Sequence, residues 1–335
     1  MFRDHPGARR RATGCPLCKM LSTARNLLLS YSLVFGFYTL WMVSMALAVA
    51  SVPIMLFSSS YRYYALAFHA CYFSYRYLFP LAAWPSLSTA LVDIYQRHPY
   101  YAKQDVVFDE GASPAKDHSK TLMAYHPHGI LCCGWLVNGG ANPVFRHSNF
   151  SWLVTDLLFL VPGMSNLLAW FQGGPAGRAN FERLAKAGDN IAIIPGGFEE
   201  ATIFARGHHR VFLKNRKGFL KLALQYGYKV HPVYTFGEEE TFASCPYFLK
   251  ARVWLNKYKV PGVIFRGLWF CFYMPFRSAR LTTVVGAPLQ LPTLDHPTVD
   301  DVTKYHNAYM AALQALFDKY KGQYATDPNA VLELF

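Results

Sequence analysis

The chain has 335 residues, of which 53% are hydrophobic and only 16% are charged, against roughly 25% charged residues in an average soluble domain. This balance excludes disordered, collagen-like and coiled-coil proteins, because each of these needs high polarity or a repeating pattern. The net charge of +13 predicts an anionic partner, either a nucleic acid, an anionic lipid surface or a phosphorylated substrate, and the high hydrophobicity favours the lipid surface.

The first 92 residues are predicted to form a membrane anchor. Residues 1–25 carry six Arg or Lys side chains against one acid, and residues 26–61 contain no Asp, Glu, Lys, Arg or His. This apolar stretch exceeds the roughly 20 residues that span a bilayer, so we expect a tilted helix or one broken near Pro53. A second apolar stretch, residues 63–92, is interrupted by two prolines. It is predicted to be the returning or interfacial half of a membrane hairpin.

The anchor sets the expected orientation of the chain. A cleaved signal peptide is not expected, because its apolar region is normally about 7–15 residues long. The basic tail, residues 1–25, should stay cytosolic, and a hairpin over residues 26–92 would leave the rest of the chain cytosolic too. A reducing compartment agrees with seven cysteines, an odd number that does not suggest a secreted disulfide framework. Two buried core helices are the alternative to the hairpin.

No metal site is predicted from the cysteines and histidines. Cys15 and Cys18 have the spacing of half a zinc site, but no second Cys or His pair follows at finger spacing. Incidental cysteines fit better, and they could also carry reversible palmitate. The adjacent His208 and His209 have no third ligand at a suitable spacing.

The remainder is predicted to be a linker, residues 93–120, followed by a catalytic domain, residues 121–335. Four short apolar runs are typical of buried strands, at 121–125, 191–194, 230–236 and 281–285. Helical patterns lie between and after them, at 178–187, at 218–226 and from Thr298 onward. Alternation of helix and buried strand predicts a mixed or mostly parallel sheet with flanking helices. The uncharged segment 157–177 is expected to dip into the membrane or to form part of an acyl-chain pocket.

The first candidate catalytic motif is His126-Pro127-His128-Gly129. It directly follows a predicted strand, which puts both imidazoles at a strand end, where open α/β sheets carry their active sites. A histidine there is a natural general base, and Gly129 allows a close backbone approach. Two structural histidines in a turn are the alternative.

The second candidate motif is Gly196-Gly197 followed by Glu200. Adjacent glycines after a strand expose backbone N–H groups that could stabilise an oxyanion, and Gly129 is a third candidate for this role. Glu200 is the candidate acid to orient a histidine. A plain glycine turn with solvated glutamates would give the same pattern.

The third candidate motif is basic. Lys214, Asn215, Arg216 and Lys217 precede a predicted helix, which gives the charge and the backbone donors needed to bind phosphates. Arg178, after a glycine-rich stretch, could bind a phosphate or buttress the site. Coenzyme A is one such ligand, and a solvated or membrane-facing basic surface is the alternative.

The order of these blocks resembles the type 2 diacylglycerol acyltransferase family, which also includes monoacylglycerol and wax-alcohol acyltransferases. The resemblance covers about residues 121–321 and the preceding apolar hairpin. The motifs that carry it are His126-Pro127-His128-Gly129, Gly196-Gly197 with Glu200-Ala201, Leu213-Lys214-Asn215-Arg216-Lys217-Gly218-Phe219, Pro232-Val233, Phe236-Gly237-Glu238, Val284-Val285-Gly286-Ala287-Pro288, and Tyr305-His306 with Tyr309.

The chain departs from related patterns at two places. The broader glycerolipid acyltransferase pattern has an Asp at the fifth position after its histidine, where this chain has Leu131 or Cys133. That departure is the expected state for the type 2 family and argues against a lysophospholipid acyltransferase. The Tyr-Phe-Pro block of the family has no clean copy, and His98-Pro99-Tyr100-Tyr101 occupies its region.

The resemblance implies a glycerolipid-acyltransferase-like fold and a membrane-bound enzyme that acylates a neutral-lipid hydroxyl from acyl-CoA, with no other cofactor. Diacylglycerol is the expected acceptor, and monoacylglycerol or a long-chain alcohol is the alternative. His128, or else His126, would be the base, with Glu200 as its orienting acid; a Cys132 or Cys133 nucleophile is not required.

The expected location is the endoplasmic reticulum membrane, with the catalytic domain facing the cytosol, and the lipid droplet surface. The partners are acyl-CoA, the lipid acceptor and the bilayer, and a homo-oligomer is left open. An inactive membrane scaffold is the alternative from another class. A nucleic-acid binder is disfavoured because no nucleic-acid module is recognisable.

Overall fold

A computed structural model describes residues 16–258, 260 and 262–335 of the chain. The expectations for residues 1–15 and for the Cys15 and Cys18 side chains lie outside the described part. The centre of the fold is a seven-stranded sheet with the order β1-β10-β7-β2-β5-β3-β4. Its strands are β1 (Lys103–Phe108), β2 (Thr121–His126), β3 (Phe150–Val154), β4 (Gly173–Pro175), β5 (Asn190–Ile193), β7 (Lys229–Phe236) and β10 (Arg280–Val285).

The sheet is mixed and mostly parallel, as predicted. Every neighbouring pair runs parallel except β10 and β7. Two further sheets have two strands each, β6 (His209–Val211) with β11 (Leu332–Leu334) and β8 (Ala243–Ser244) with β9 (Phe265–Arg266). The four strands predicted from apolar runs are present with ends shifted by one residue at most.

Alternation along β2 divides the hydrophobic core between the two faces of the sheet. Leu122 and Ala124 pack in the cluster that includes side chains of α5, α7 and α9. Met123 and Tyr125 pack on the other side against Phe150 and other aromatic side chains. Successive side chains of a strand point to opposite faces, so a fully apolar run is what a strand covered on both faces requires.

The helices of the α/β domain follow the predicted pattern closely. They are α5 (Arg178–Ala187), α6 (Gly197–Ile203), α7 (Gly218–Tyr226) and α9 (Val299–Tyr324), with α4 (Met164–Trp170), α8 (Leu249–Leu255) and the short helices η1 (Trp135–Gly140), η2 (Pro143–Phe145), η3 (Asp156–Leu160), η4 (Glu238–Glu240) and η5 (Asn256–Tyr258). Both α5 and α7 end at a glycine in the left-handed conformation. The predicted capping box at the start of α9 is present, with Thr298 and Asp301 bonded reciprocally.

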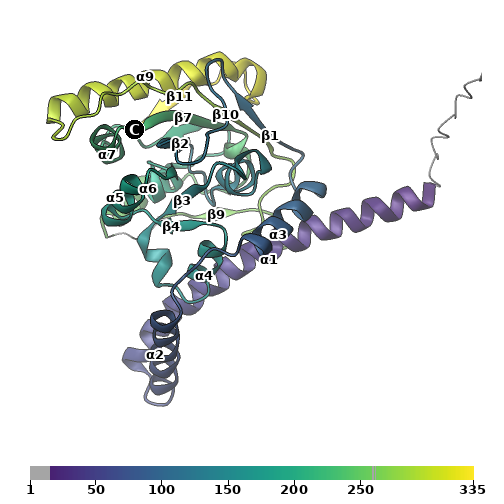
Figure 1. The fold of residues 1–335 in the computed structure, drawn as a ribbon. Helices are drawn as coiled ribbons and strands as arrows, with labels where there is room; N and C mark the ends of the chain where they lie inside the picture. The colour runs from purple at the N-terminus through teal and green to yellow at the C-terminus, as the bar shows by residue number, and fades with distance from the viewer. Residues whose placement is uncertain (1–15, 259, 261) are drawn as a thin grey trace, which may run out of the picture.

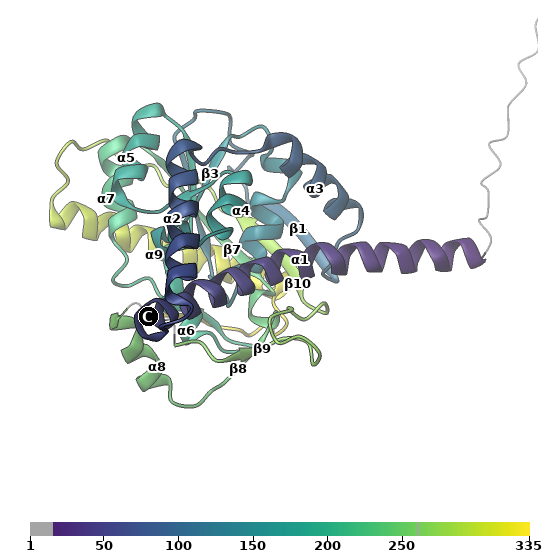
Figure 2. The same cartoon turned by 90° about the horizontal axis from the view of Figure 1, so that it is seen from below.

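The amino-terminal apolar segment forms one long helix, α1 (Pro16–Phe57), which continues through Pro53 without a break. Its part from Met20 to Phe57, whose most apolar 18-residue stretch has a mean hydropathy of 2.1, is the one helix of the described residues that is long and apolar enough to cross a membrane. Figure 1 shows its amino-terminal half extending away from the domain, and Figure 2 shows the same rod from below.

The second half of the expected hairpin is not a second span. It forms α2 (Arg62–Leu78) and α3 (Pro85–Arg97). Helix α2 folds back beside α1, where His69 Nε2 lies 3.0 Å from Ser51 Oγ, but it has only 17 residues and carries Arg62 and Arg76. Arg76 Nη1 donates to Ser165 Oγ of α4 at 2.9 Å. Through these polar contacts α2 connects α1 to the domain. Among the described residues only α1 is long and apolar enough to be a candidate membrane span.

Segment 93–120, expected to be a linker, contributes strand β1 to the edge of the main sheet. The strand pairs with β10, and Asp109 just after it accepts hydrogen bonds from Lys319 Nζ at 2.6 Å and from Tyr320 Oη at 2.9 Å. The strand is not predicted from the sequence because it contains the charged Lys103 and Asp105. An edge strand has one solvated side and lacks the continuous apolar run of a central strand.

Asn190 joins three segments at the amino end of β5. Its Oδ1 accepts the backbone N–H groups of Ser119 and Thr121 at 3.2 and 3.0 Å. Its Nδ2 donates to the carbonyls of Lys116 and Ser148 at 2.7 and 2.6 Å. The side chain is fully buried, and its bonds to Thr121 and Ser148 satisfy backbone groups that are buried with it.

Replacing Asn190 with Leu, which has a similar size, should destabilise the fold by about 3 kcal/mol, because several buried backbone groups lose their partners at once. Thermal unfolding in detergent micelles measures the effect. Asn307→Leu, at an exposed position of α9, is the matched control and should leave the midpoint unchanged. Equal midpoints for the two variants would show that the Asn190 bonds do not stabilise the domain.

Candidate active site

The predicted catalytic motifs meet at one edge of the main sheet. Strands β2 and β5 pair in parallel, with Ala124 opposite Ile193, so their carboxyl ends lie side by side. His126 is the last residue of β2 and His128 lies in the turn that follows it, and the turn after β5 carries Gly196 and the start of α6. Parallel topology thereby joins motifs that are some 70 residues apart in the sequence, as the distance of 2.8 Å from the His128 amide nitrogen to Glu200 Oε2 shows.

His126 is the inner of the two histidines and is fully buried. Its Nε2 lies 3.0 Å from the hydroxyl of Tyr309 on α9. Its Nδ1 lies 3.7 Å from Glu200 Oε1. Tyr309 and Glu200 enclose the His126 ring on both sides, which is typical of a structural histidine. His126 is therefore the weaker candidate for the general base.

His128 is only partly buried and has the geometry of a general base. Its Nδ1 lies 3.0 Å from the carbonyl oxygen of Gly129. A carbonyl only accepts hydrogen bonds, so Nδ1 must carry the proton, and Nε2 of the neutral ring is left as the acceptor. Burial lowers the pKa of His128 below its ordinary 6.5, and the Gly129 bond and the charge of Glu200 offset this only in part. The ring is therefore neutral at neutral pH.

Glu200 holds the backbone of the turn rather than the ring of His128. Its carboxylate is buried on α6 and accepts the backbone N–H groups of His128 at 2.8 Å and of Phe212 at 2.9 Å. The contact of Glu200 with His128 is through the backbone N–H, whereas its Oε1 lies 3.7 Å from Nδ1 of His126, the alternative base, so its role as the orienting acid stays a prediction. In the structure Glu200 fixes the position of the His128 backbone.

A second buried carboxylate, Glu238, completes the support of this turn. It accepts the backbone N–H groups of Cys133 at 3.0 Å and of Gly134 at 2.6 Å. Burial raises its pKa to about 7, and the two backbone bonds counter that rise. No role for Glu238 is predicted from the sequence. Its place in the Phe236-Gly237-Glu238 block, directly after a predicted strand, was the signal that could have pointed to it.

Glycine is needed at two positions for close approach to these carboxylates. A Cβ on Gly129, whose φ is +63°, would lie 2.1 Å from Glu238 Oε1, and a Cβ on Gly196 would lie 2.3 Å from Glu200 Oε2. The Gly197 N–H is bonded to the Ile194 carbonyl at 3.2 Å, so it is not free to bind an oxyanion. Of the three predicted oxyanion donors, Gly129 and Gly196 therefore keep that role as a proposal.

The two cysteines of the turn are thiols and not nucleophiles at neutral pH. Cys132 Sγ lies 3.3 Å from His128 Nε2. Burial, followed by the charge of Glu238, raises the pKa of both the Cys132 and the Cys133 thiol. A protonated thiol is a poor nucleophile, so the raised pKa values disfavour a cysteine nucleophile in this turn.

The basic segment lies against the same turns, but its members differ. Arg216 Nη2 forms an ion pair with Glu199 Oε2, and its guanidinium lies 5.3 Å from the centre of the Phe212 ring. Lys217 Nζ donates to Thr303 Oγ1 at 3.1 Å. Lys214 and Asn215 are exposed. The charge of Arg216 is already matched, so the segment's exposed cation is Lys214.

Arg178 is not joined to this segment. It is exposed in the first turn of α5, and its Nε donates to Glu182 Oε1 at 2.7 Å. In the described part of the chain it makes no hydrogen bond or ion pair with residues 214–217. Among the described residues, no group of three or more His, Cys, Asp or Glu is placed to hold a metal ion.

Comparisons with known proteins show the family to which the chain belongs. The family model described as diacylglycerol acyltransferase matches residues 109–335. Diacylglycerol O-acyltransferase 2 of Dictyostelium discoideum is 30% identical over 251 residues, which are 70% of this chain and 75% of that protein. Diacylglycerol O-acyltransferase 2 of Homo sapiens is 32% identical over 245 residues, 64% of this chain and 60% of that protein.

Two further matches belong to related activities. The 2-acylglycerol O-acyltransferase 3 of Homo sapiens is 34% identical over 220 residues, 60% of this chain and 64% of that protein. The crystal structure of the 1-acyl-sn-glycerophosphate acyltransferase of Thermotoga maritima superposes with a TM-score of 0.43 and 14% identity, covering 90% of this chain and 99% of that one. The chain spans less than two thirds of the length of both human relatives.

His209 and Glu239 form a buried pair of titratable groups. His209 Nδ1 is 2.9 Å from the hydroxyl of Tyr234 and 3.7 Å from Glu239 Oε2. Burial raises the pKa of Glu239 to about 8 and lowers the pKa of His209 to about 4. Both groups are therefore neutral near pH 6.5. This pair makes the stability of the domain depend on pH.

We expect stability to fall as the pH rises from 6.5 to about 8. Glu239 keeps its proton up to about pH 8 in the folded chain but loses it near pH 4.5 when unfolded, so the folded state binds more protons in this window. Glu239→Gln, which stays neutral, should show a flatter decline in thermal midpoint. Glu110→Gln, at an exposed position, should keep the wild-type slope. Identical slopes in all three proteins would contradict the buried, protonated Glu239.

Proposed function

Because this chain belongs to the diacylglycerol acyltransferase family and is an acyltransferase, we propose that it transfers an acyl group from acyl-CoA to the hydroxyl of diacylglycerol and forms triacylglycerol. The observation that carries the assignment is the His128 imidazole, with Nδ1 fixed by the Gly129 carbonyl and Nε2 left as an acceptor. Monoacylglycerol is the second candidate acceptor, favoured by the 34% identity to 2-acylglycerol O-acyltransferase 3.

The proposed reaction transfers the acyl group directly from the thioester sulfur of acyl-CoA to the hydroxyl oxygen of the lipid acceptor. His128 Nε2 removes the proton of the lipid hydroxyl as its oxygen attacks the thioester carbonyl carbon. A C–O bond forms, the C–S bond breaks, and the departing thiolate takes the proton from His128. The N–H groups of Gly129 and Gly196 are the proposed donors to the oxyanion of the intermediate. A thioester is already activated, so no acyl-enzyme is needed.

In this proposal Glu200 and Glu238 position the base by hydrogen bonds to the backbone of its turn. Glu200 binds the backbone N–H groups of His128 and Phe212. Glu238 binds those of Cys133 and Gly134, which follow His128 along the chain. Together they keep residues 128–134 in place while the ring gains and loses a proton. Positioning of this kind lets the imidazole meet two substrates without rearrangement of the turn.

The proposed site for the phosphates of coenzyme A is the exposed part of the basic segment, Lys214 and Asn215, with Lys217 at the start of α7. The free N–H groups at the amino end of a nine-residue helix add to the attraction for an anion. Arg216 would act through its ion pair with Glu199, which ties the segment to the turn after β5.

We further propose that the enzyme acts at a membrane, with α1 in the bilayer and the domain on the cytosolic side, in the endoplasmic reticulum or at the lipid droplet surface. The length and hydropathy of α1 support the membrane location. Both the acceptor and the product dissolve in the bilayer, whereas acyl-CoA carries its charges in water, so an interfacial site serves both.

His128→Ala should reduce acyl transfer by about a hundredfold or more, the usual contribution of a positioned base, while the protein remains in the membrane fraction. Formation of triacylglycerol from labelled acyl-CoA is the measurement. His147→Ala, at an exposed histidine, is the control and should keep full activity. Near-normal transfer by the His128 variant would exclude this ring as the base.

Lys214→Glu should raise the KM for acyl-CoA about tenfold at low ionic strength and leave the KM for the lipid acceptor unchanged, because a cation that attracts phosphate becomes an anion that repels it. Lys221→Glu, at an exposed lysine of α7, is the control of equal charge change. An equal effect of both variants would mean that only net charge matters and that Lys214 has no specific contact.

A further inference from the structure

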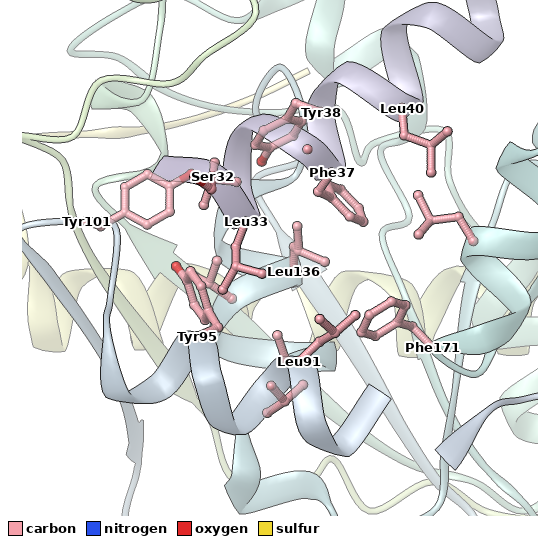
Figure 3. A pocket seen from close by; sticks show the side chains of 16 residues that line it. Ser32, Leu33, Phe37, Tyr38, Leu40, Leu91, Tyr95, Tyr101, Leu136 and Phe171 are labelled. Carbon is pink, nitrogen blue, oxygen red and sulfur yellow. The ribbon is translucent and has the colours of Figure 1, made fainter. Parts of the chain in front are cut away.

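A cavity of about 310 Å³ lies between α1, α3 and η1. Its walls are almost wholly apolar, and Figure 3 shows Leu33 and Phe37 of α1 facing Leu91 of α3 and Leu136 of η1 across it. Pockets for small ligands usually enclose about 300–1,000 Å³. The volume and the lining fit a hydrocarbon chain and exclude a charged headgroup.

A second apolar cavity adjoins this one on the side of the proposed base. A smaller cavity of about 50 Å³ shares Phe37, Leu136, Leu167 and Phe171 with the first. Its lining also includes Cys132, whose Sγ lies 3.3 Å from His128 Nε2. A chain lying in the larger cavity would therefore point at the imidazole through the smaller one.

The outer side of the larger cavity is formed by one face of α1. Ser32, Gly36 and Leu40, four residues apart and so one above another on the helix, line the cavity and are also exposed. A Cβ added to Gly36 would meet no atom within 4 Å. This stretch lies within the part of α1 that is apolar enough to cross a membrane, so with α1 in the bilayer, as proposed above, the cavity would open toward hydrocarbon rather than toward water.

The two substrates can reach the proposed base by different routes. The basic segment that suits the phosphates of acyl-CoA contacts the turn from the side of Glu199 and Phe212. The cavity adjoins the same turn from the side of Cys132 and is walled by the membrane helix. An uncharged lipid dissolved in the bilayer can enter past α1 without crossing water.

We propose that this cavity binds a hydrocarbon chain of the lipid acceptor, which enters from the bilayer past Ser32 and Gly36. Helix α1 is then one wall of the substrate site and not only an anchor. The inference rests on the proposed function, since it assigns the acceptor side of that reaction.

Gly36→Phe tests the opening, because it places an aromatic ring where open space lies now. It should raise the KM for diacylglycerol, presented in phosphatidylcholine vesicles, about tenfold and change the KM for acyl-CoA less than about twofold. Ala50→Phe adds the same ring at an exposed position of α1 that lines neither cavity, and should change neither. An effect on acyl-CoA alone, or no effect of Gly36→Phe, would overturn the proposal.

Photolabelling of the unmodified protein tests the same site without a variant. A diacylglycerol with a diazirine at the end of one acyl chain, in the same vesicles, should label peptides that contain residues 32–41, 91–101 or 131–173, which hold the residues that line the two cavities. Labelling confined to other peptides would overturn the assignment. Labelling at the cavity by a wild-type protein that forms no triacylglycerol would refute the proposed function and leave the lipid site standing.

Discussion

The buried carboxylate of Glu200 is the contact on which the arrangement of the site depends. It binds the backbone N–H groups of His128 and Phe212 and lies against Gly196, where no side chain would fit. One acidic group thus joins the turn after β2, the start of α6 and the chain that leads to the basic segment. An unpaired buried carboxylate would be costly, so these three segments must come together for the group to be satisfied.

The same device occurs a second time on the other side of the turn, where Glu238 binds Cys133 and Gly134. Two carboxylates hold the backbone, and a backbone carbonyl holds the imidazole. Because different groups hold the backbone and the ring of His128, the side chain is well oriented although it is partly exposed. This arrangement also places the proposed base between two kinds of surroundings, a cationic segment on one side and apolar space beside α1 on the other.

Sequence patterns predicted the central strands and the helices that cover them, because burial on both faces leaves continuous apolar runs and glycines mark the helix ends. The edge strand β1 was missed because its Lys103 and Asp105 are solvated. The candidate residues were found, but not their contacts. A buried acid can bind any donor that the fold brings near, and the partners of Glu238 lie 104 and 105 residues away, so no local pattern indicates them.

The length of α1 was predictable from its composition, whereas its second role was not, because a cavity wall is a property of the elements packed against it. The most direct test of the whole account is acyl transfer from labelled acyl-CoA by membranes that contain this protein, with diacylglycerol, monoacylglycerol and a long-chain alcohol offered in parallel. The account predicts that triacylglycerol dominates among the labelled products. Transfer to none of the three lipid hydroxyls would contradict it.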